Sequence, residues 1–153
     1  MTQLVPSIFA GPGRDGDFAW MIKQPRFSDA FFLFNDDEGR FAHHRRNVGT
    51  DHTCPRGAGN AVIRPYQCRR PPRAAGIPTG ARGRGYSALT PEVERVIDEA
   101  VATAVADARA SGAQRVFYSA ADSTGGLGTG IFQVAPEVKE HIVQRLRSAF
   151  AGD

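Results

Sequence analysis

The sequence predicts an α/β fold with a mostly parallel central sheet. Two apolar runs, Ala30–Phe34 and Arg115–Ala121, have the length and composition of buried strands. They alternate with two amphipathic helical segments, Thr90–Gly112 and Pro136–Phe150, and this order favours parallel strands with helices over both faces of the sheet. The chain of 153 residues has the size of one domain, and residues 1–153 contain no internal repeat and no linker.

The N-terminal residues 1–28 mix short apolar pieces with Gly and Pro, which predicts no more than an edge strand and a turn. The first residues, MTQLVPSIFAGPG, lack the basic start and the apolar core of a signal peptide. No apolar run approaches the ~18–20 residues that span a bilayer. We therefore expect a soluble, cytoplasmic protein with no membrane partner.

The middle of the chain is predicted to be mostly loop. Asn35–Arg40 (NDDEGR) reads as a loop at the carboxyl end of the first strand, and residues 41–85 are rich in Arg, Gly and Pro. Within that stretch, Gly57–Tyr66 (GAGNAVIRPY) predicts one or two helical turns, whose length Pro65 limits. Ala74–Gly80 (AAGIPTG) is either a short strand or a turn.

The two helical segments carry clear signals at their ends. Thr90 is a candidate N-cap, Pro91 suits the first helical position, and Gly112 is a natural stop. Apolar residues at helical spacing predict the buried stripe of the first helix: Val93, Val96, Ile97, Ala100, Val101, Ala104, Val105 and Ala108. The final helix is predicted to bury Val138, Ile142, Leu146 and Phe150.

Positive charge is concentrated in one part of the chain. Of 17 Arg, ten lie between Arg40 and Arg84, where Asp51 is the only acid, so this arginine block has a net charge near +9. The guanidinium group suits phosphate and carboxylate, which indicates an anionic partner, either a nucleotide or a nucleic acid. The alternative is a basic surface that binds nothing.

The glycine loop, Gly125–Phe132 (GGLGTGIF), follows the second predicted strand and precedes the final helix. Its glycines Gly125, Gly126, Gly128 and Gly130 let consecutive backbone N–H groups surround phosphate oxygens. The spacing matches neither the Walker A motif nor the dinucleotide fingerprint. The alternative is a tight connection without a ligand.

A second candidate loop precedes the short helical segment. Gly57 and Gly59 open it, the Asn60 amide lies beside them, and Arg64 supplies a positive charge. This loop favours phosphate binding when it is combined with the glycine loop, and alone it is also typical of an ordinary helix start.

Polar side chains follow the first strand. Asn35, Asp36, Asp37 and Glu38 could bind a ribose hydroxyl or a metal, or supply a general base, and a solvated turn is the alternative. Phe132 either stacks on a base or ribose or packs in the core. Because loops at the carboxyl ends of parallel strands meet at one edge, we expect these groups to lie together.

The histidines and cysteines do not predict a metal site or a cofactor. The spacings of His43, His44, His52, Cys54 and Cys68 match no standard zinc pattern. Two cysteines in a chain of this length also do not make a disulfide framework.

In several of these segments the chain resembles the macrodomains, a family of ADP-ribose-binding domains. The resemblance lies in the strand RVFYSAA, the glycine loop and the last helix, and GAGNAVIRPY is similar to the first glycine-rich loop of that family. It implies a three-layer α/β/α fold in which the glycine loop wraps the diphosphate and its aromatic residue packs by the distal ribose. The chain also resembles small bacterial and phage proteins with a GDN…GGQA…GIPT…GTG pattern, over Phe31 to Leu146.

The resemblance implies a function for each predicted loop. Backbone N–H groups of Gly57–Asn60 and of Gly128–Phe132, which includes Thr129 and Ile131, would hold the phosphates, while Asn35, Asp36 or Asp37 would contact ribose or base. Hydrolysis of an ADP-ribosyl bond would use Asp36 or Asp37 to orient water. Macrodomains usually have Asn-Ala-Ala-Asn where this chain has Asn35–Glu38. The alternatives are a non-catalytic protein that sequesters or senses a nucleotide signal and a nucleic-acid-binding module that uses the arginine block.

Overall fold

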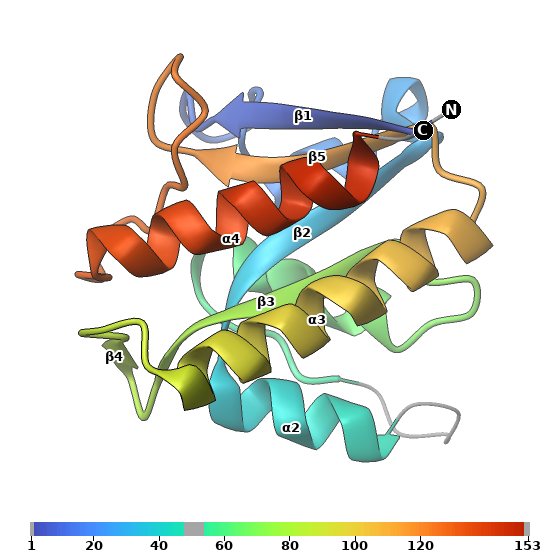
Figure 1. The fold of residues 1–153 in the computed structure, drawn as a ribbon. Helices are drawn as coiled ribbons and strands as arrows, with labels where there is room; N and C mark the ends of the chain where they lie inside the picture. Colours follow the sequence, from blue (N-terminus) through green and yellow to red (C-terminus); the bar gives the residue numbers. More distant parts are fainter. Residues whose placement is uncertain (1, 48–53, 152–153) are drawn as a thin grey trace.

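The computed structural model describes residues 2–47 and 54–151 and contains a five-stranded sheet with the order β1-β5-β2-β3-β4 (Figure 1). Four strands pair in parallel, and they are β1 (Gln3–Ile8), β5 (Arg115–Ala120), β2 (Ala30–Asp37) and β3 (Ala74–Ala81). The short β4 (Arg84–Gly85) forms an antiparallel hairpin with β3. The fold is therefore mixed α/β with a mostly parallel sheet, as the sequence predicts.

The helical elements alternate with these strands. The α-helices are α1 (Phe18–Met21), α2 (Glu38–Asn47), α3 (Pro91–Ala110) and α4 (Pro136–Phe150). The two 3₁₀ helices are η1 (Pro25–Phe27) and η2 (Gly59–Gln67). Among the described residues, none of these helices combines the length and the apolar character needed to cross a bilayer.

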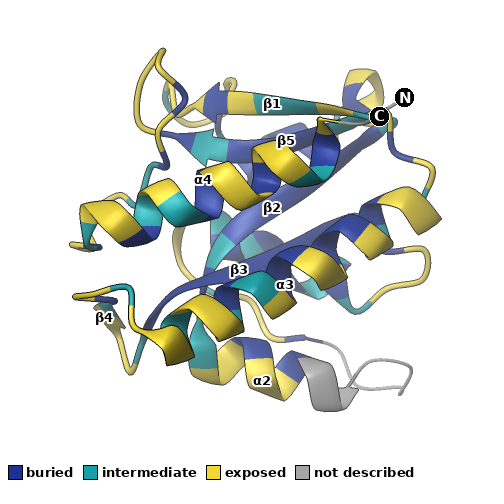
Figure 2. Ribbon diagram, in the orientation of Figure 1, coloured by how far each residue is buried: buried dark blue, intermediate teal, exposed yellow. Residues whose placement is uncertain are grey.

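Both faces of the sheet are covered, and β2 contributes apolar side chains to a core on each face. Phe31 and Leu33 belong to one core, together with the buried residues of α3 and α4. Phe32 and Phe34 belong to a second core that contains Ile63 of η2 and the buried residues of α1. Figure 2 shows that α3 and α4 turn their buried residues toward the sheet and their exposed residues outward.

The two long helices confirm the sequence prediction closely. The Thr90 hydroxyl accepts a hydrogen bond from the Val93 N–H at 3.1 Å and caps α3. Gly112, with φ +74°, follows the end of α3 in the left-handed conformation that terminates many helices. The helix α4 spans Pro136–Phe150, the same bounds that the apolar spacing predicts.

The prediction of a loop at Asn35–Arg40 is wrong. β2 continues through Asp37, with an irregularity in its pairing at Asp36/Asp37, and α2 begins at Glu38. The Asp37 carboxylate accepts a hydrogen bond from the Gly39 N–H at 2.9 Å, which ties the end of the strand to the first turn of the helix. The sequence gives little sign of α2, since only Phe41 and His44 among its residues 38–44 are buried.

Other predictions left open are now decided. Residues 1–28 contain the edge strand β1 together with α1 and η1. Ala74–Gly80 is a strand and not a turn, and every residue in it is buried. Pro65 does not end the short helical segment, because η2 runs on to Gln67 as a 3₁₀ helix.

Candidate functional site

A small pocket of about 160 Å³ lies at the carboxyl ends of β2 and β3. In Figure 1 this is the edge of the sheet where β4 and the start of α4 lie. Four segments line it, namely the end of β2, the start of η2, the β3–β4 hairpin and the glycine loop. The lining residues are Asn35, Asp36, Asp37, Ala58, Ala61, Arg64, Thr79, Gly80, Gly83, Arg84, Gly85, Thr129 and Phe132.

A buried ion pair joins two elements that line the pocket. Arg64 of η2 donates from Nη2 to Asp36 Oδ1 at 2.6 Å and from Nε to Asp36 Oδ2 at 3.3 Å. A third donor, Arg64 Nη1, reaches the Pro55 carbonyl at 2.9 Å. Burial raises the pKa of the Asp36 carboxyl, and the hydrogen bonds and charge of Arg64 oppose that rise. Both charges are thus paired within the protein.

Two glycines make room for this ion pair. A Cβ on Gly57 would lie 2.8 Å from Arg64 Nη2, and a Cβ on Gly76 would lie 2.8 Å from Asp36 Oδ2. Real Cβ atoms essentially never come so close to another heavy atom. Gly57 therefore leaves space for the Arg64 guanidinium group of the protein itself. The sequence analysis interpreted this glycine as a phosphate contact and did not anticipate the guanidinium group.

The glycine loop folds back onto the end of β5. The Gly128 N–H donates to the Ser119 carbonyl at 2.9 Å, and a Cβ on Gly128 would lie 3.1 Å from the backbone of Ala120. The Asn35 side chain donates from Nδ2 to the Gly128 carbonyl at 2.7 Å. Asn35 thereby connects the end of β2 to the glycine loop across the sheet edge.

Beyond Gly128, the loop presents backbone donors that the protein does not use. Within the described part of the chain, the N–H groups of Thr129, Gly130 and Ile131 have no hydrogen-bond acceptor. Gly130 has φ +60° with open space around it, and Ile131 is 93% exposed. Three consecutive donors beside a residue in the left-handed conformation are typical of anion-binding backbone.

The start of η2 presents a second set of donors. Among the described residues, no acceptor pairs with the N–H groups of Ala58, Gly59 and Asn60. Gly59 has φ +58°, and Ala58 and Gly59 are both exposed. The first N–H groups of a helix commonly bind anions. Ala58 and Thr129, which begin the two sets, both line the pocket.

The β3–β4 hairpin closes the remaining side of the pocket. Asp37 accepts from the Gly83 N–H at 3.3 Å and so holds the hairpin turn against the end of β2. At Gly85, a Cβ would collide with the Gln133 carbonyl beyond the glycine loop. The next residue, Tyr86, accepts at its carbonyl from the Ala135 N–H at 2.8 Å.

The structure brings some of the predicted site residues to one place and uses others elsewhere. The residues that line the pocket are Asn35, Asp36, Asp37, Arg64, Thr129 and Phe132. The predicted residues that do not line it are Gly57, Gly59, Asn60, Gly126, Gly128, Gly130 and Ile131. Asn60 accepts from the Phe18 N–H at 3.1 Å and donates to the Gly16 carbonyl at 3.3 Å, so its amide fixes the N-terminal segment.

The structure bears on the two alternatives for Phe132, and it adds lining residues that the sequence analysis did not name. Phe132 is 50% exposed and lines the pocket, which disfavours core packing. Sequence reasoning missed the hairpin residues Thr79, Gly80, Gly83, Arg84 and Gly85. The closely spaced glycines of GARGRG are typical of a hairpin turn and could have indicated it.

The arginine block does not form one surface. Arg64 is buried, and Arg73 donates to the carbonyls of Ala30 and Phe27 at 3.2 and 3.0 Å. Arg84 is exposed and lines the pocket. Among the arginines of the block whose side chains the structure describes, Arg64 and Arg73 therefore serve the interior, and the charge available to a partner is smaller than the sequence suggests.

His44 of α2 lies beside Cys54 and Cys68, the two cysteines that flank η2. Cys54 and Cys68 are joined by a disulfide, which the sequence analysis did not anticipate. His44 Nδ1 lies 3.3 Å from Cys54 Sγ and 3.2 Å from Cys68 Sγ. Burial, and secondarily the charge of Arg70, lowers the pKa of His44 to about 4. His52, which the sequence analysis grouped with them, lies outside the described residues.

A larger hollow of about 750 Å³ lies between β1 and α4, with Leu4, Tyr118 and Arg147 among its lining residues. The Tyr118 hydroxyl is already bonded to the Gly125 carbonyl, and Arg147 donates to the Thr124 carbonyl. We therefore regard the smaller pocket, with its unused backbone donors, as the better candidate site.

Comparisons with known proteins do not assign the chain to a family. No family model matches it, and we find no significant match among curated proteins or among solved structures.

Proposed function

We propose that the pocket binds ADP-ribose or a related nucleotide by its phosphate and ribose groups. The observation that carries this proposal is the presence of two sets of unused backbone N–H groups, Ala58–Asn60 and Thr129–Ile131, each of which begins at a residue that lines the pocket. Phosphate oxygens are strong acceptors, and such donors hold them without a cationic side chain.

The other lining groups suit the remaining parts of a nucleotide. The exposed guanidinium of Arg84 supplies a positive charge at the rim, and the half-exposed ring of Phe132 offers a face for a base or ribose. Thr79 supplies a hydroxyl for a sugar hydroxyl. The pocket is smaller than the ~300–1,000 Å³ that encloses a drug-sized ligand, so part of the nucleotide would lie outside it.

The carboxylates favour binding over hydrolysis. Both oxygens of Asp36 accept from Arg64, and both oxygens of Asp37 accept from backbone N–H groups. A general base needs a lone pair directed at the proton that it removes. A hydrolase that uses Asp37 to orient water is the alternative, and the water would then share an Asp37 oxygen with the Gly39 or Gly83 N–H.

The macrodomain resemblance supports the same proposal. We infer a three-layer arrangement, with α3 and α4 over one face of the sheet and α1 and η2 over the other. The two donor sets then lie at the carboxyl edge of a mostly parallel sheet, the usual place for a ligand in such folds.

The test is calorimetric titration with ADP-ribose, ADP, pyrophosphate and adenosine. Binding of the first three and not of adenosine is expected, because the phosphates supply the acceptors. Product analysis by chromatography in the same samples separates a binder, which leaves ADP-ribosyl bonds intact, from a hydrolase. Absence of binding by every phosphate-containing probe contradicts the proposal.

A variant pair localises the binding. Gly130→Val forces a branched side chain on a residue with φ +60°, which displaces the donors, and it is expected to abolish nucleotide binding. Gly112→Val is the matched control, because Gly112 has a similar φ of +74°, open surroundings and no part in the pocket. Equal affinity in the two variants would place the ligand elsewhere.

The exposed arginines keep nucleic acid as a second candidate ligand. Arg69, Arg70, Arg82 and Arg84 are all exposed. Binding to long RNA or DNA would weaken steeply with added salt, since phosphate contacts release counterions. A nucleotide complex that resists salt, together with no RNA or DNA binding, decides against this candidate.

A further inference from the structure

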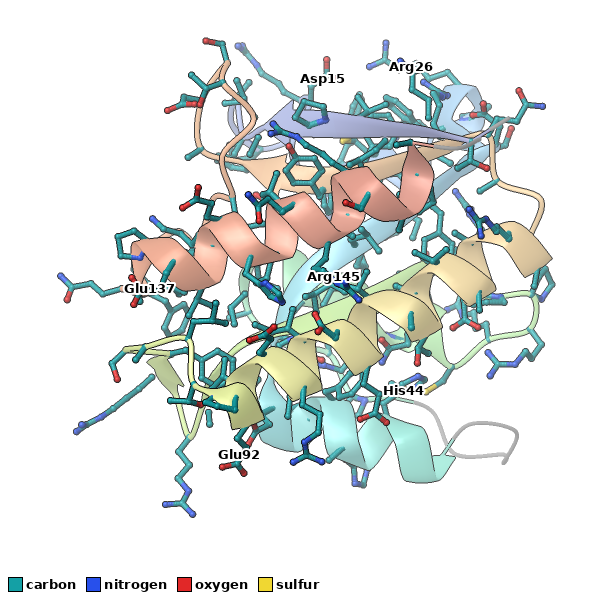
Figure 3. The ribbon with its side chains drawn as sticks, viewed as in Figure 1. Asp15, Arg26, His44, Glu92, Glu137 and Arg145 are labelled. Atoms are coloured by element: carbon teal, nitrogen blue, oxygen red, sulfur yellow. A yellow bond between two sulfur atoms is a disulfide. The ribbon has the colours of Figure 1, made fainter. Side chains whose placement is uncertain are left out.

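A second candidate site lies outside the pocket, where α2 meets both ends of η2. His44 comes from α2, Cys54 precedes η2 and Cys68 is the residue after it. Their ligand atoms all lie within 4.8 Å of one another. His44 and Cys54 are buried and Cys68 is partly buried, and Figure 3 labels His44 on α2.

The donor set is that of a thiophilic metal. Cysteine thiolate and histidine nitrogen are the preferred zinc ligands, and three protein ligands with one open position are typical of many zinc sites. With Zn–S of about 2.3 Å and Zn–N of about 2.0 Å, tetrahedral geometry separates nitrogen and sulfur by about 3.5 Å. The two distances from His44 Nδ1 to the sulfurs, 3.3 and 3.2 Å, are close to that value.

The disulfide is the form of the cysteines that excludes the metal, because thiolates and not a disulfide bind zinc. A dithiol reductant gives two electrons and two protons to the S–S bond, which yields two thiols, while the reductant becomes a disulfide. Zn²⁺ then displaces the two thiol protons to solvent as it binds. The Cα atoms of Cys54 and Cys68 are 5.8 Å apart, so side-chain rotation alone can separate the sulfurs.

The charge balance of the surroundings also suits the metal. Arg70 lies near enough to His44 to affect its electrostatics, and it belongs to the arginine block. Zn²⁺ with two thiolates and a neutral imidazole has no net charge, so it adds no positive charge beside these arginines. Binding in this form therefore avoids the cost of burying an unpaired ion.

We propose that reduction of the Cys54–Cys68 disulfide converts His44, Cys54 and Cys68 into a binding site for a thiophilic divalent cation, with Zn²⁺ as the best match. The disulfide links the two segments that flank η2, and the metal would link the same two segments and also α2 through His44. A reducing compartment favours the thiols and hence the metal-bound form.

The test is titration of the full chain with Zn²⁺, in parallel samples with the disulfide intact and with it reduced by a metal-free phosphine. One Zn²⁺ per chain is expected for the reduced protein and none at this site for the oxidised protein. Co²⁺ in place of Zn²⁺ should give thiolate charge-transfer absorption in the reduced sample. Absence of stoichiometric metal in the reduced protein, or equal binding in both samples, overturns the proposal.

Variants identify the ligands. Cys68→Ser and His44→Gln are expected to lose Zn²⁺ binding in the reduced state, whereas His141→Gln retains it. His141 is a fair control, because it belongs to the other group of potential ligands in the described residues, with Glu94 and Asp98. Unchanged binding in Cys68→Ser overturns the assignment. If that variant fails to fold, the Co²⁺ absorption of the reduced wild type decides, since it reports sulfur ligation directly.

Discussion

The carboxylate of Asp36 and the guanidinium of Arg64 form a two-point ion pair in the interior, with Asp36 5% and Arg64 6% exposed. Asp36 lies near the end of β2 and Arg64 lies in η2, so the pair joins two of the elements that line the pocket. Removal of one partner leaves the other charge buried and unpaired. This explains why the pair is expected to matter more for stability than its number of hydrogen bonds suggests.

Asp36→Asn is expected to lower the free energy of unfolding by about 3–5 kcal/mol, the usual cost of breaking a buried pair. Urea denaturation monitored by circular dichroism measures it. The control is Asp15→Asn, because Asp15 and Arg26 form an exposed pair at 69% and 63% side-chain exposure (Figure 3), for which about 0–1 kcal/mol is expected. Similar losses in both variants would mean that the buried pair contributes no more than a surface one.

Gly76→Ala is expected to destabilise the protein by about 1–3 kcal/mol, the range for overpacking, because the new Cβ would lie 2.8 Å from Asp36 Oδ2. Gly126→Ala is the matched control, since a Cβ there meets nothing closer than 3.9 Å and no left-handed φ is required. The midpoint of urea denaturation should fall for Gly76→Ala and stay within error for Gly126→Ala. The reverse order contradicts this account of the two glycines.

Asn35→Ala removes the hydrogen bond that connects β2 to the Gly128 carbonyl. A loss of about 0.5–1.5 kcal/mol in stability is expected, together with faster hydrogen exchange at the Gly128 N–H, which donates to the Ser119 carbonyl. If the glycine loop binds phosphate, the affinity for ADP-ribose falls as well. Gln144→Ala, on the exposed side of α4, should change none of these quantities. Exchange rates in the loop that match the wild type would show that Asn35 does not hold it.

The stability of the protein is expected to fall at alkaline pH because of Tyr86. Burial, followed by the hydrogen bond to Glu38 at 2.9 Å and the charge of that carboxylate, raises the pKa of the Tyr86 hydroxyl. A group whose pKa is higher in the folded state stabilises the protein below its unfolded value of about 10, and this stabilisation is lost as pH rises through the folded value. Unfolding free energies between about pH 9 and pH 12 measure the loss.

Tyr86→Phe should flatten this alkaline decline, because no hydroxyl remains to ionise. Glu38→Gln removes one negative charge beside the hydroxyl, so the pKa of Tyr86 should move back toward its ordinary value, as absorbance of the tyrosinate would report. A decline of the same steepness in Tyr86→Phe would assign the effect to other groups.

The parts of the fold that the sequence predicts are those with a strong local signal. The helix α4 has apolar residues at regular spacing, and Thr90 and Gly112 mark the ends of α3, so both helices can be located from the sequence. The helix α2 could not be predicted, since its described part buries only Phe41 and His44 and its other residues are polar, glycine or alanine. Its position depends on packing beside β3, which no local pattern records.

The candidate site, like the fold, could be predicted from the sequence only in part. The sequence places Asn35, Asp36 and the two glycine-rich loops at one edge, since strands that run in parallel end on the same side. It does not reveal that Asp36 pairs with Arg64, because the two residues are 28 positions apart in the sequence and only the tertiary fold brings them together. For the same reason Gly57 and Gly128 could be read as ligand contacts, although each accommodates the protein's own atoms.

The close approach of Gly85 to the Gln133 carbonyl holds the β3–β4 hairpin, which lines the pocket, against the segment after the glycine loop. Because the Tyr86 carbonyl and the Ala135 N–H join the hairpin to the residues after the glycine loop, these two rims of the pocket cannot separate independently. A ligand that exceeds the pocket must extend through its open side and cannot widen it by moving one rim alone. If the pocket binds phosphate-bearing molecules as we propose, its fixed width would select among them by the breadth of the group that enters first.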